Sequence, residues 1–315
     1  MEKFKKLKIS DFGSLIALII LIIVISLLNR NFATLDNFLS LLRQSSINGL
    51  IAFGMTLVIL TGGIDLSVGS VLAFTTAIAA KLILDGVTSP LAMLVALILG
   101  AIFGLITGVI ITKGRIQPFI ATLISMTVFR GLTMIFSNGK PISGLYKGTE
   151  FSNKFLEFVG KGSFLGIPVP VWILVISFII VRFVLQNTTF GRKVYATGCN
   201  EKAAALAGIN INKTKIAVYA ISGFFAALAG LILMSRLGSA QPTLGSGYEL
   251  DAIAAGALGG ISLSGGRGKI FGTLIGVLII AVLNNGLNII GVSSYYQQVV
   301  KGIVILIAVL ADKDR

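Results

Sequence analysis

The sequence predicts an all-α polytopic membrane protein with about ten transmembrane helices, some of them broken or short. Three observations point to this class: 55% of the 315 residues are hydrophobic, only 12% are charged, and the mean hydropathy is +0.97. Soluble domains carry about 25% charged residues. The runs of Leu, Ile, Val and Phe are long enough to cross the roughly 30 Å hydrocarbon core of a bilayer.

The residue inventory argues against an enzyme. The chain has no His, and its single Cys is Cys199. This removes the commonest general base, the usual zinc ligand, any intrachain disulfide and any metal site built of Cys alone. We therefore expect neither a catalytic site nor a cofactor in this chain. The net charge of +14 is assigned to loops at a membrane surface, not to binding of nucleic acid.

The apolar runs place the spans in order along the chain. The first run, Leu15 to Leu28, lacks a following cleavage site of small residues, so it is interpreted as an uncleaved span and not as a secretory signal. The predicted spans are 13–29, 46–61, 66–84, 90–112, 117–136, 168–186, 214–235, 250–263, 270–290 and 295–311. The run 250–263 is short for a full crossing, and a re-entrant segment is the alternative.

An even number of spans puts both termini on one side of the membrane. Fifteen Lys and Arg residues would lie on the side of the N-terminus and seven on the other, which favours a cytosolic N-terminus. The predicted organisation is a cytosolic segment at 1–12, one transmembrane domain at 13–311 and a cytosolic tail at 312–315. Four further cations, Lys81, Arg130, Arg182 and Lys301, fall inside or near spans, where long side chains can reach the interface.

Two connecting segments are long enough to carry a function. Residues 137–167 should lie outside the cell, and residues 187–213 should lie in the cytosol. Trp172 follows Pro168 and Pro170 at the start of a span, where an interfacial aromatic residue is expected.

A short phrase recurs at two breaks between apolar runs. "GGIDLSVG" begins at Gly62 and "GGISLSGG" begins at Gly259, with six identities in eight positions. Downstream, "GLITGVII" from Gly104 resembles "GTLIGVLI" from Gly272, at a different spacing. A diverged internal repeat, common in transporters, and chance similarity both account for this pattern.

Asp65 in the first phrase corresponds to Ser262 in the second. Both side chains can accept from backbone N–H groups and start a helix, and the glycines Gly62, Gly63, Gly259 and Gly260 permit the turn. An intramembrane carboxylate is alternatively a proton or cation carrier. We prefer the helix cap, because a carrier would be hard to replace by Ser and would be expected near the middle of a span.

Two stretches expected in the cytosol are rich in glycine or alanine. "LSGGRGK", Leu263 to Lys269, lacks the spacing and the Ser or Thr of a phosphate-binding loop, so the chain should not hydrolyse ATP by itself. "NEKAAALAGI" predicts a short helix with Asn200 as its N-cap and Gly208 just beyond its end. That helix would fit either a groove in a partner protein or its own membrane domain.

Four phrases closely resemble the permease subunit of bacterial ribose-type ABC importers, over about Leu15 to Leu310. They are "GMTLVILTGGIDLSVGSVLAF", "GCNEKAAALAGIN", "SAQPTLGSGYELDAIAAGALGG" and "LNNGLNIIGVSSYYQQVVKGIVILIAVL". The resemblance implies a multi-pass protein of the bacterial cytoplasmic membrane that forms a two-copy channel. It would work with a cytosolic ATPase, which holds ATP and Mg²⁺, and with a sugar-binding protein outside the membrane.

The resemblance also implies site residues. Glu201, Ala203, Ala204 and Gly208, with Asn200 before them, stand where the family's Glu-Ala-Ala…Gly coupling helix would be, although here the wording is Glu-Lys-Ala-Ala. A sugar path should be lined by amides and hydroxyls, and the alternative for such residues is interhelical hydrogen bonding. The amides considered for the path are Asn48, Asn284, Asn288 and Gln297. Residues considered for contact with the binding protein, or else as surface or helix-start residues, are Gln241, Tyr248, Glu249 and Asp251.

Rival functions stay open at this point. Permeases for other small solutes, such as galactose, xylose or nucleosides, share much of this pattern. A secondary transporter driven by an ion gradient would need buried acids at mid-span, and the only candidate, Asp65, stands at a predicted helix start.

Overall fold

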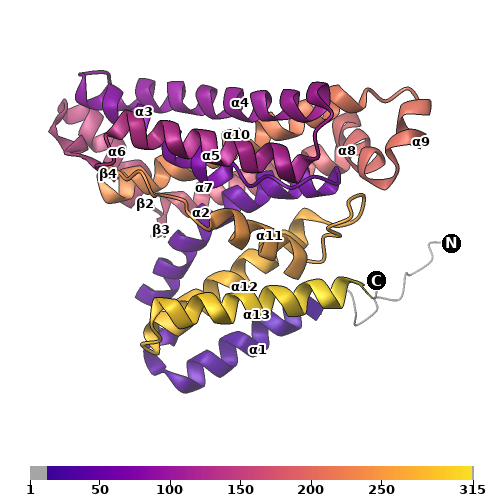
Figure 1. Ribbon diagram of the computed structural model, residues 1–315. Helices are drawn as coiled ribbons and strands as arrows, with labels where there is room; N and C mark the ends of the chain where they lie inside the picture. The colour runs from indigo at the N-terminus through magenta and orange to yellow at the C-terminus, as the bar shows by residue number, and fades with distance from the viewer. Residues whose placement is uncertain (1–12, 314–315) are drawn as a thin grey trace.

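A computed structural model describes residues 13–313, which are mostly helical (Figure 1). The α-helices are α1 Gly13–Leu28, α2 Leu35–Leu60, α3 Val68–Leu84, α4 Ser89–Gly114, α5 Pro118–Ser137, α6 Glu150–Lys161, α7 Val169–Asn187, α8 Thr189–Cys199, α9 Glu201–Leu206, α10 Ile211–Leu237, α11 Tyr248–Leu258, α12 Ile270–Ile289 and α13 Ser294–Lys313. Short 3₁₀ turns, η2 Arg30–Ala33 and η3 Leu145–Lys147, and the two-residue strands β1 Ile142–Ser143, β2 Ser163–Phe164, β3 Ile167–Pro168 and β4 Ser239–Ala240 complete the elements.

Five helices in the described part of the chain are long and apolar enough to cross a membrane: α4, α5, α7, α10 and α12. The helices α1 and α3 are apolar but shorter. The prediction of a mostly helical, polytopic membrane protein is confirmed. The predicted span boundaries agree with the helix ends to within three residues, except at α2 and α11.

Helix α2 begins at Leu35 and not near residue 46, so the prediction there was wrong. The first turns of α2 carry Asp36, Asn37 and Arg43, which lower the hydropathy without preventing a helix. Thr34 starts the helix because its hydroxyl accepts from the N–H of Asn37 (3.4 Å).

Helix α11 has only 11 residues and rises about 16 Å, which is too short to cross a bilayer. Its predicted end at residue 263 was also wrong, because the helix stops at Leu258 before the glycines Gly259 and Gly260. It packs against α2, α12 and α13.

The helices form two groups that meet at α2 (Figure 1). Helix α10 packs against α2, α3 and α4, and glycines bring α10 and α4 together: a Cβ at Gly100 would lie 2.6 Å from the carbonyl oxygen of Gly223. In a bilayer the hydrophobic effect does not drive helices together, so they associate through close van der Waals packing, which small residues permit. Helices α1, α12 and α13 form the other group, with α11 between the two groups.

Residues 137–167 are more structured than a loop. Strand β1 pairs with β4 in antiparallel register, Ile142 opposite Ala240, and the hydroxyl of Tyr146 donates to the carbonyl of Ser235. Helix α6 was missed by the sequence prediction, although Thr149 caps it by accepting from the N–H of Ser152 (3.3 Å). This segment lies at one end of α4 and α10, and α8 and α9 lie at the other end (Figure 1).

Candidate functional site

The predicted 200–208 helix is present as α9. The side chain of Asn200 accepts from the N–H of Ala203 (3.0 Å), which confirms the N-cap. Gly208 has φ +83°, and the N–H of Ile209 donates to the carbonyl of Ala204 (3.0 Å), so the helix ends as predicted. Helix α8, which the sequence prediction missed, precedes α9 directly.

Most of helix α9 is exposed to solvent, and one of its residues packs against the rest of the chain. Ala204 is 5% exposed and packs inside the chain, and Glu201 forms an ion pair with Lys215 of α10. Ala203 is exposed, and Leu206 is 91% exposed. Leu206 was not singled out from the sequence; the signal was a large apolar residue in an otherwise alanine-rich helix outside the apolar runs. An apolar side chain that is exposed to this extent would be stabilised by burial against a partner, so it is a candidate contact.

The two helix breaks meet next to the end of α8. The N–H of Gly266 donates to the carbonyl of Leu60 (3.0 Å), and a Cβ at Gly265 would lie 2.8 Å from the backbone nitrogen of Gly62. The thiol of Cys199 donates to the carbonyl of Gly266 (3.4 Å). We call these three segments, 60–63, 198–199 and 262–268, the break junction.

Gly198 lies at the centre of the break junction. A Cβ there would overlap the carbonyl oxygen of Leu60 and lie 2.5 Å from the backbone nitrogen of Gly266. Tyr195, one turn earlier in α8, donates its hydroxyl to the carbonyl of Gly268 (2.9 Å). Burial raises the pKa of Tyr195, which keeps the phenol protonated as a donor. Movement of α8 would therefore reach both breaks.

The first break is organised around Asp65, which is 1% exposed. Its Oδ1 accepts from the N–H (3.0 Å) and the hydroxyl (2.6 Å) of Ser67, and its Oδ2 accepts from the hydroxyl of Ser222 on α10 (2.8 Å). The Asp65 side chain accepts from a backbone N–H, as expected, but the expectation that it caps α3 is wrong: Ser67 precedes the first residue of α3, and Asp65 holds the turn before it. No ion pair involving Asp65 occurs among residues 13–313.

Gly62 has φ +77°, and Gly63 packs against Tyr219 of α10, where a Cβ would lie 2.5 Å from the Tyr219 hydroxyl oxygen. These two features require glycine at the turn and at the close approach. The first break therefore joins α2, α3 and α10 at one point.

The second break differs from the first. Ser262 was expected to cap a helix, and this is wrong: its N–H donates to the carbonyl of Arg267 (3.0 Å), and the next helix begins only at Ile270. Glycines at positive φ turn the intervening residues into a loop: Gly260, Gly265, Gly266 and Gly268. Gly259 has no positive φ, and instead packs against the backbone of Gly272.

The similar phrases that begin at Gly104 and Gly272 lie in helices that do not correspond. The first is in α4, the second helix after its break, and the other is in α12, the first helix after its break. What recurs in the structure is the break itself.

The amides considered for a path have different environments. Asn284 is 7% exposed, and its Oδ1 has no hydrogen-bond partner within residues 13–313. Asn288 is exposed and accepts from Nε2 of Gln297 (2.9 Å), so these two side chains form a hydrogen bond across the turn between α12 and α13. Asn48 is partly exposed on α2. Of the four, Asn284 combines burial with an unused acceptor.

The sequence prediction missed a reciprocal amide pair between Asn37 and Asn285. Their side chains exchange two hydrogen bonds of 3.0 and 2.9 Å, and Asn29 donates to the carbonyl of Ile289 (3.2 Å). These contacts hold α1 and the start of α2 on α12.

The residues considered for contact with a binding protein are held mainly within the chain. Asp251 is 8% exposed and forms an ion pair with Lys301 of α13 (3.0 Å), so it is an internal contact. Glu249 accepts from the N–H of Gly247 (3.2 Å) at the start of α11. Tyr248 is partly buried, and Gln241 is exposed.

The side chain of Arg130 on α5 is hydrogen-bonded within the chain. Its Nη1 donates to the carbonyls of Pro242 (2.7 Å) and Leu244 (2.9 Å) in the segment before α11. Helix α11 is thus held from α5 through its preceding segment and from α13 through Asp251.

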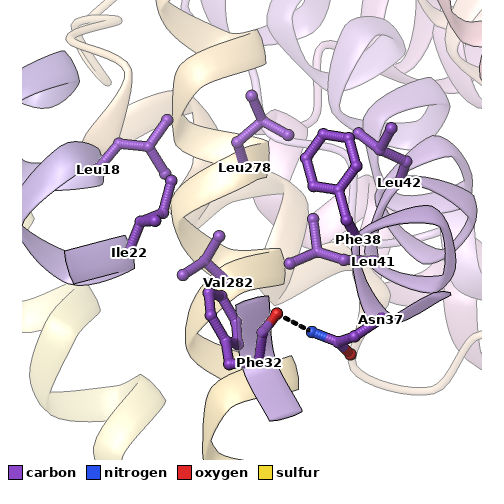
Figure 2. A pocket seen from close by; sticks show the side chains of 9 residues that line it. All are labelled: Leu18, Ile22, Phe32, Asn37, Phe38, Leu41, Leu42, Leu278 and Val282. Carbon is purple, nitrogen blue, oxygen red and sulfur yellow. Dashed lines mark hydrogen bonds between the residues drawn. The ribbon is translucent and has the colours of Figure 1, made fainter. Parts of the chain in front are cut away.

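Figure 2 shows a pocket of about 210 Å³ between α1, α2 and α12. Eight of its nine lining residues are apolar, and its one polar side chain, Asn37, is already bonded to the carbonyl of Phe32 (2.9 Å) and to Asn285. A sugar needs several free polar partners, so this pocket does not suit one.

Comparison with known proteins adds an independent observation. Residues 37–309 match the family described as "Branched-chain amino acid transport system / permease component". The Ribose import permease protein RbsC of Bacillus subtilis (strain 168) is 58% identical over 303 residues, covering 96% of this chain and 92% of that protein. The protein of the same name from Escherichia coli (strain K12) is 54% identical over 312 residues, covering 99% and 96%.

A more distant relative is the D-allose transport system permease protein AlsC of Escherichia coli (strain K12), which is 40% identical over 304 residues, covering 96% of this chain and 91% of that protein. No solved structure gives a significant match.

Proposed function

The chain belongs to the family of branched-chain amino acid transport system permease components, and from this we propose that it is the membrane-spanning permease subunit of an ATP-driven ABC importer for ribose. The observation that carries the substrate is the 54–58% identity to ribose import permeases over nearly the whole chain. Relatives named for D-allose and L-arabinose, at 40% and 38%, make other monosaccharides the alternative.

The subunit works with three partners. A cytosolic ATPase binds and hydrolyses ATP with Mg²⁺, a binding protein delivers the sugar from outside, and a second copy of this chain completes the channel. Helix α9 is the coupling helix, and its exposed Leu206 supports this assignment. The break junction passes movement of α8 and α9 to the spans, because it joins both breaks to Gly198 and Cys199.

The topology has ten crossings within one permease domain, 13–311, the eighth made by the segment that begins at β4 together with α11, and both termini lie in the cytosol of a bacterial cell. The charge distribution supports this orientation. So does the placement of 137–167 and of 187–213 at opposite ends of α4 and α10 (Figure 1).

The function is tested by uptake of radiolabelled ribose in cells that express this chain with its ATPase and binding protein. We expect uptake that survives an uncoupler of the ion gradient, stops on ATP depletion, and requires both partners. Competition by unlabelled allose, arabinose, galactose and xylose measures substrate breadth. Uptake that follows the ion gradient without either partner would identify a secondary transporter and overturn the proposal.

Asn284 is the residue we place on the sugar path. A buried acceptor without a partner costs roughly 1–3 kcal/mol, and a passing hydroxyl group would supply the missing donor. Asn284→Leu removes the unused acceptor at similar volume. We expect it to be at least as stable as the parent and to lower the rate of ribose uptake at least about fivefold, which corresponds to a barrier raised by about 1 kcal/mol.

The matched control is the neighbouring Asn285→Leu, which breaks the pair with Asn37. This variant should lower the thermal midpoint of the purified protein while its folded fraction still transports. Wild-type uptake by Asn284→Leu would remove this residue from the path.

A further inference from the structure

The β2–β3 hairpin before α7 ends in an unusual turn. Its two turn residues, Leu165 and Gly166, have φ of +53° and +76°. A two-residue hairpin turn with both residues at positive φ strongly prefers Asn, Asp or Gly at the first position. Leu165 is strained there, and it is also 78% exposed. The tip of the hairpin thus carries an apolar side chain at a backbone conformation that disfavours it.

The hairpin is joined to the start of α7. The indole Nε1 of Trp172 donates to the carbonyl of Phe164 (3.1 Å), and the two rings meet edge to face with centroids 6.1 Å apart. Phe164 is itself exposed. The tip residues and Trp172 therefore form one apolar and aromatic surface.

This surface continues the outward face of a membrane span. Helix α7 is one of the five helices that are long and apolar enough to cross the bilayer. Trp172, Ile176, Ile179 and Phe183 follow at helical spacing on one face, and the last three are exposed apolar side chains. On a span, such a face contacts lipid chains, and Trp at its end marks the level of the headgroups.

Helix α6, which leads into the hairpin, has the pattern of a helix lying in a membrane interface. Its exposed Phe151 and Phe158 are seven residues apart, and they lie between the buried face around Leu156 and a charged face, which carries Glu150, Lys154, Glu157 and Lys161. Helices that lie in the interface expose aromatic side chains next to a charged face in this way.

We propose that Phe164 and Leu165 insert into the bilayer interface beside α7 and anchor residues 137–168 to the lipid surface. The hairpin then has a lipid partner and is not a docking surface for the sugar-binding protein. The inference holds whichever solute the channel carries.

The chain offers a direct probe, because Trp172 is its only Trp. Exchanging the two rings with Phe164→Trp and Trp172→Phe moves the reporter onto the hairpin. In liposomes containing the full chain, phosphatidylcholine brominated near the headgroup should quench this reporter by about half or more, and lipid brominated near the chain ends should quench it less. Acrylamide in the water should quench it weakly.

Two variants at the tip separate lipid contact from hairpin folding. Leu165→Asn suits the turn but removes the apolar tip, so quenching by brominated lipid should fall; Leu165→Phe should retain it. The proposal is overturned if brominated lipid does not quench the reporter fluorescence. This holds both if acrylamide quenches it strongly and if the binding protein is needed to protect it from acrylamide. Equal quenching in Leu165→Asn and the parent would also overturn it.

Discussion

Replacing Leu206 by Arg is expected to reduce ATP-driven ribose uptake at least about thirtyfold, because an apolar anchor in an interface contributes roughly 2 kcal/mol or more. The side chain is 91% exposed, so the substitution removes almost no contact within the chain. Folding should be unaffected, since exposed substitutions change stability by only about 0.5 kcal/mol. The loss should appear as failure of the ATPase to co-purify with the variant and as loss of uptake.

Two comparison variants sharpen the result. Leu206→Met keeps an apolar side chain and should retain the ATPase. Ala204→Trp changes the one buried residue of α9, so it should lower thermal stability together with uptake. If Leu206→Arg transports ribose normally with the ATPase attached, α9 does not couple through this residue.

Local signals in the sequence predicted most of the helices. Hydropathy places the spans because lipid contact selects apolar residues along the whole helix, and Asn200 predicted α9 because a cap depends on residues within one turn. Helices α6 and α8 were missed because they lack the apolar length of a span. Their caps were readable: Thr149 accepts from Ser152, and Thr188 accepts from the N–H of Gly191 (3.2 Å).

The site was only partly predictable because its contacts join distant parts of the chain. Asn37 and Asn285 are 248 residues apart, and Arg130 reaches carbonyls more than 100 residues away. No local pattern reports which Asn pairs with which. The repeated phrase misled at Ser262 for a related reason: the glycines beyond it turn the backbone into a loop, whereas the residues after Asp65 continue as α3.

Asp65→Ala is expected to destabilise the protein by about 3 kcal/mol, because two hydroxyls and one N–H lose their acceptor at a buried site. The thermal midpoint in detergent should fall by about 5 °C or more. Asp65→Asn keeps one acceptor oxygen, and its amide can donate to either Ser hydroxyl, so the loss should be much smaller. The fluorescence of Trp172 or size-exclusion chromatography after heating would measure both.

The same pair of variants decides whether Asp65 anchors the break or carries an ion. An anchor needs oxygen atoms that accept from Ser67 and Ser222, and Asn supplies one of them; a carrier needs an ionisable group, which Asn lacks. We therefore expect Asp65→Asn to retain most ribose uptake, with unchanged resistance to an uncoupler. The donors that surround Asp65 come from α10 and from the start of α3, so their common acceptor holds the first break against α10. A stable Asp65→Asn protein without transport would contradict this role and make the carboxylate itself part of the transport cycle.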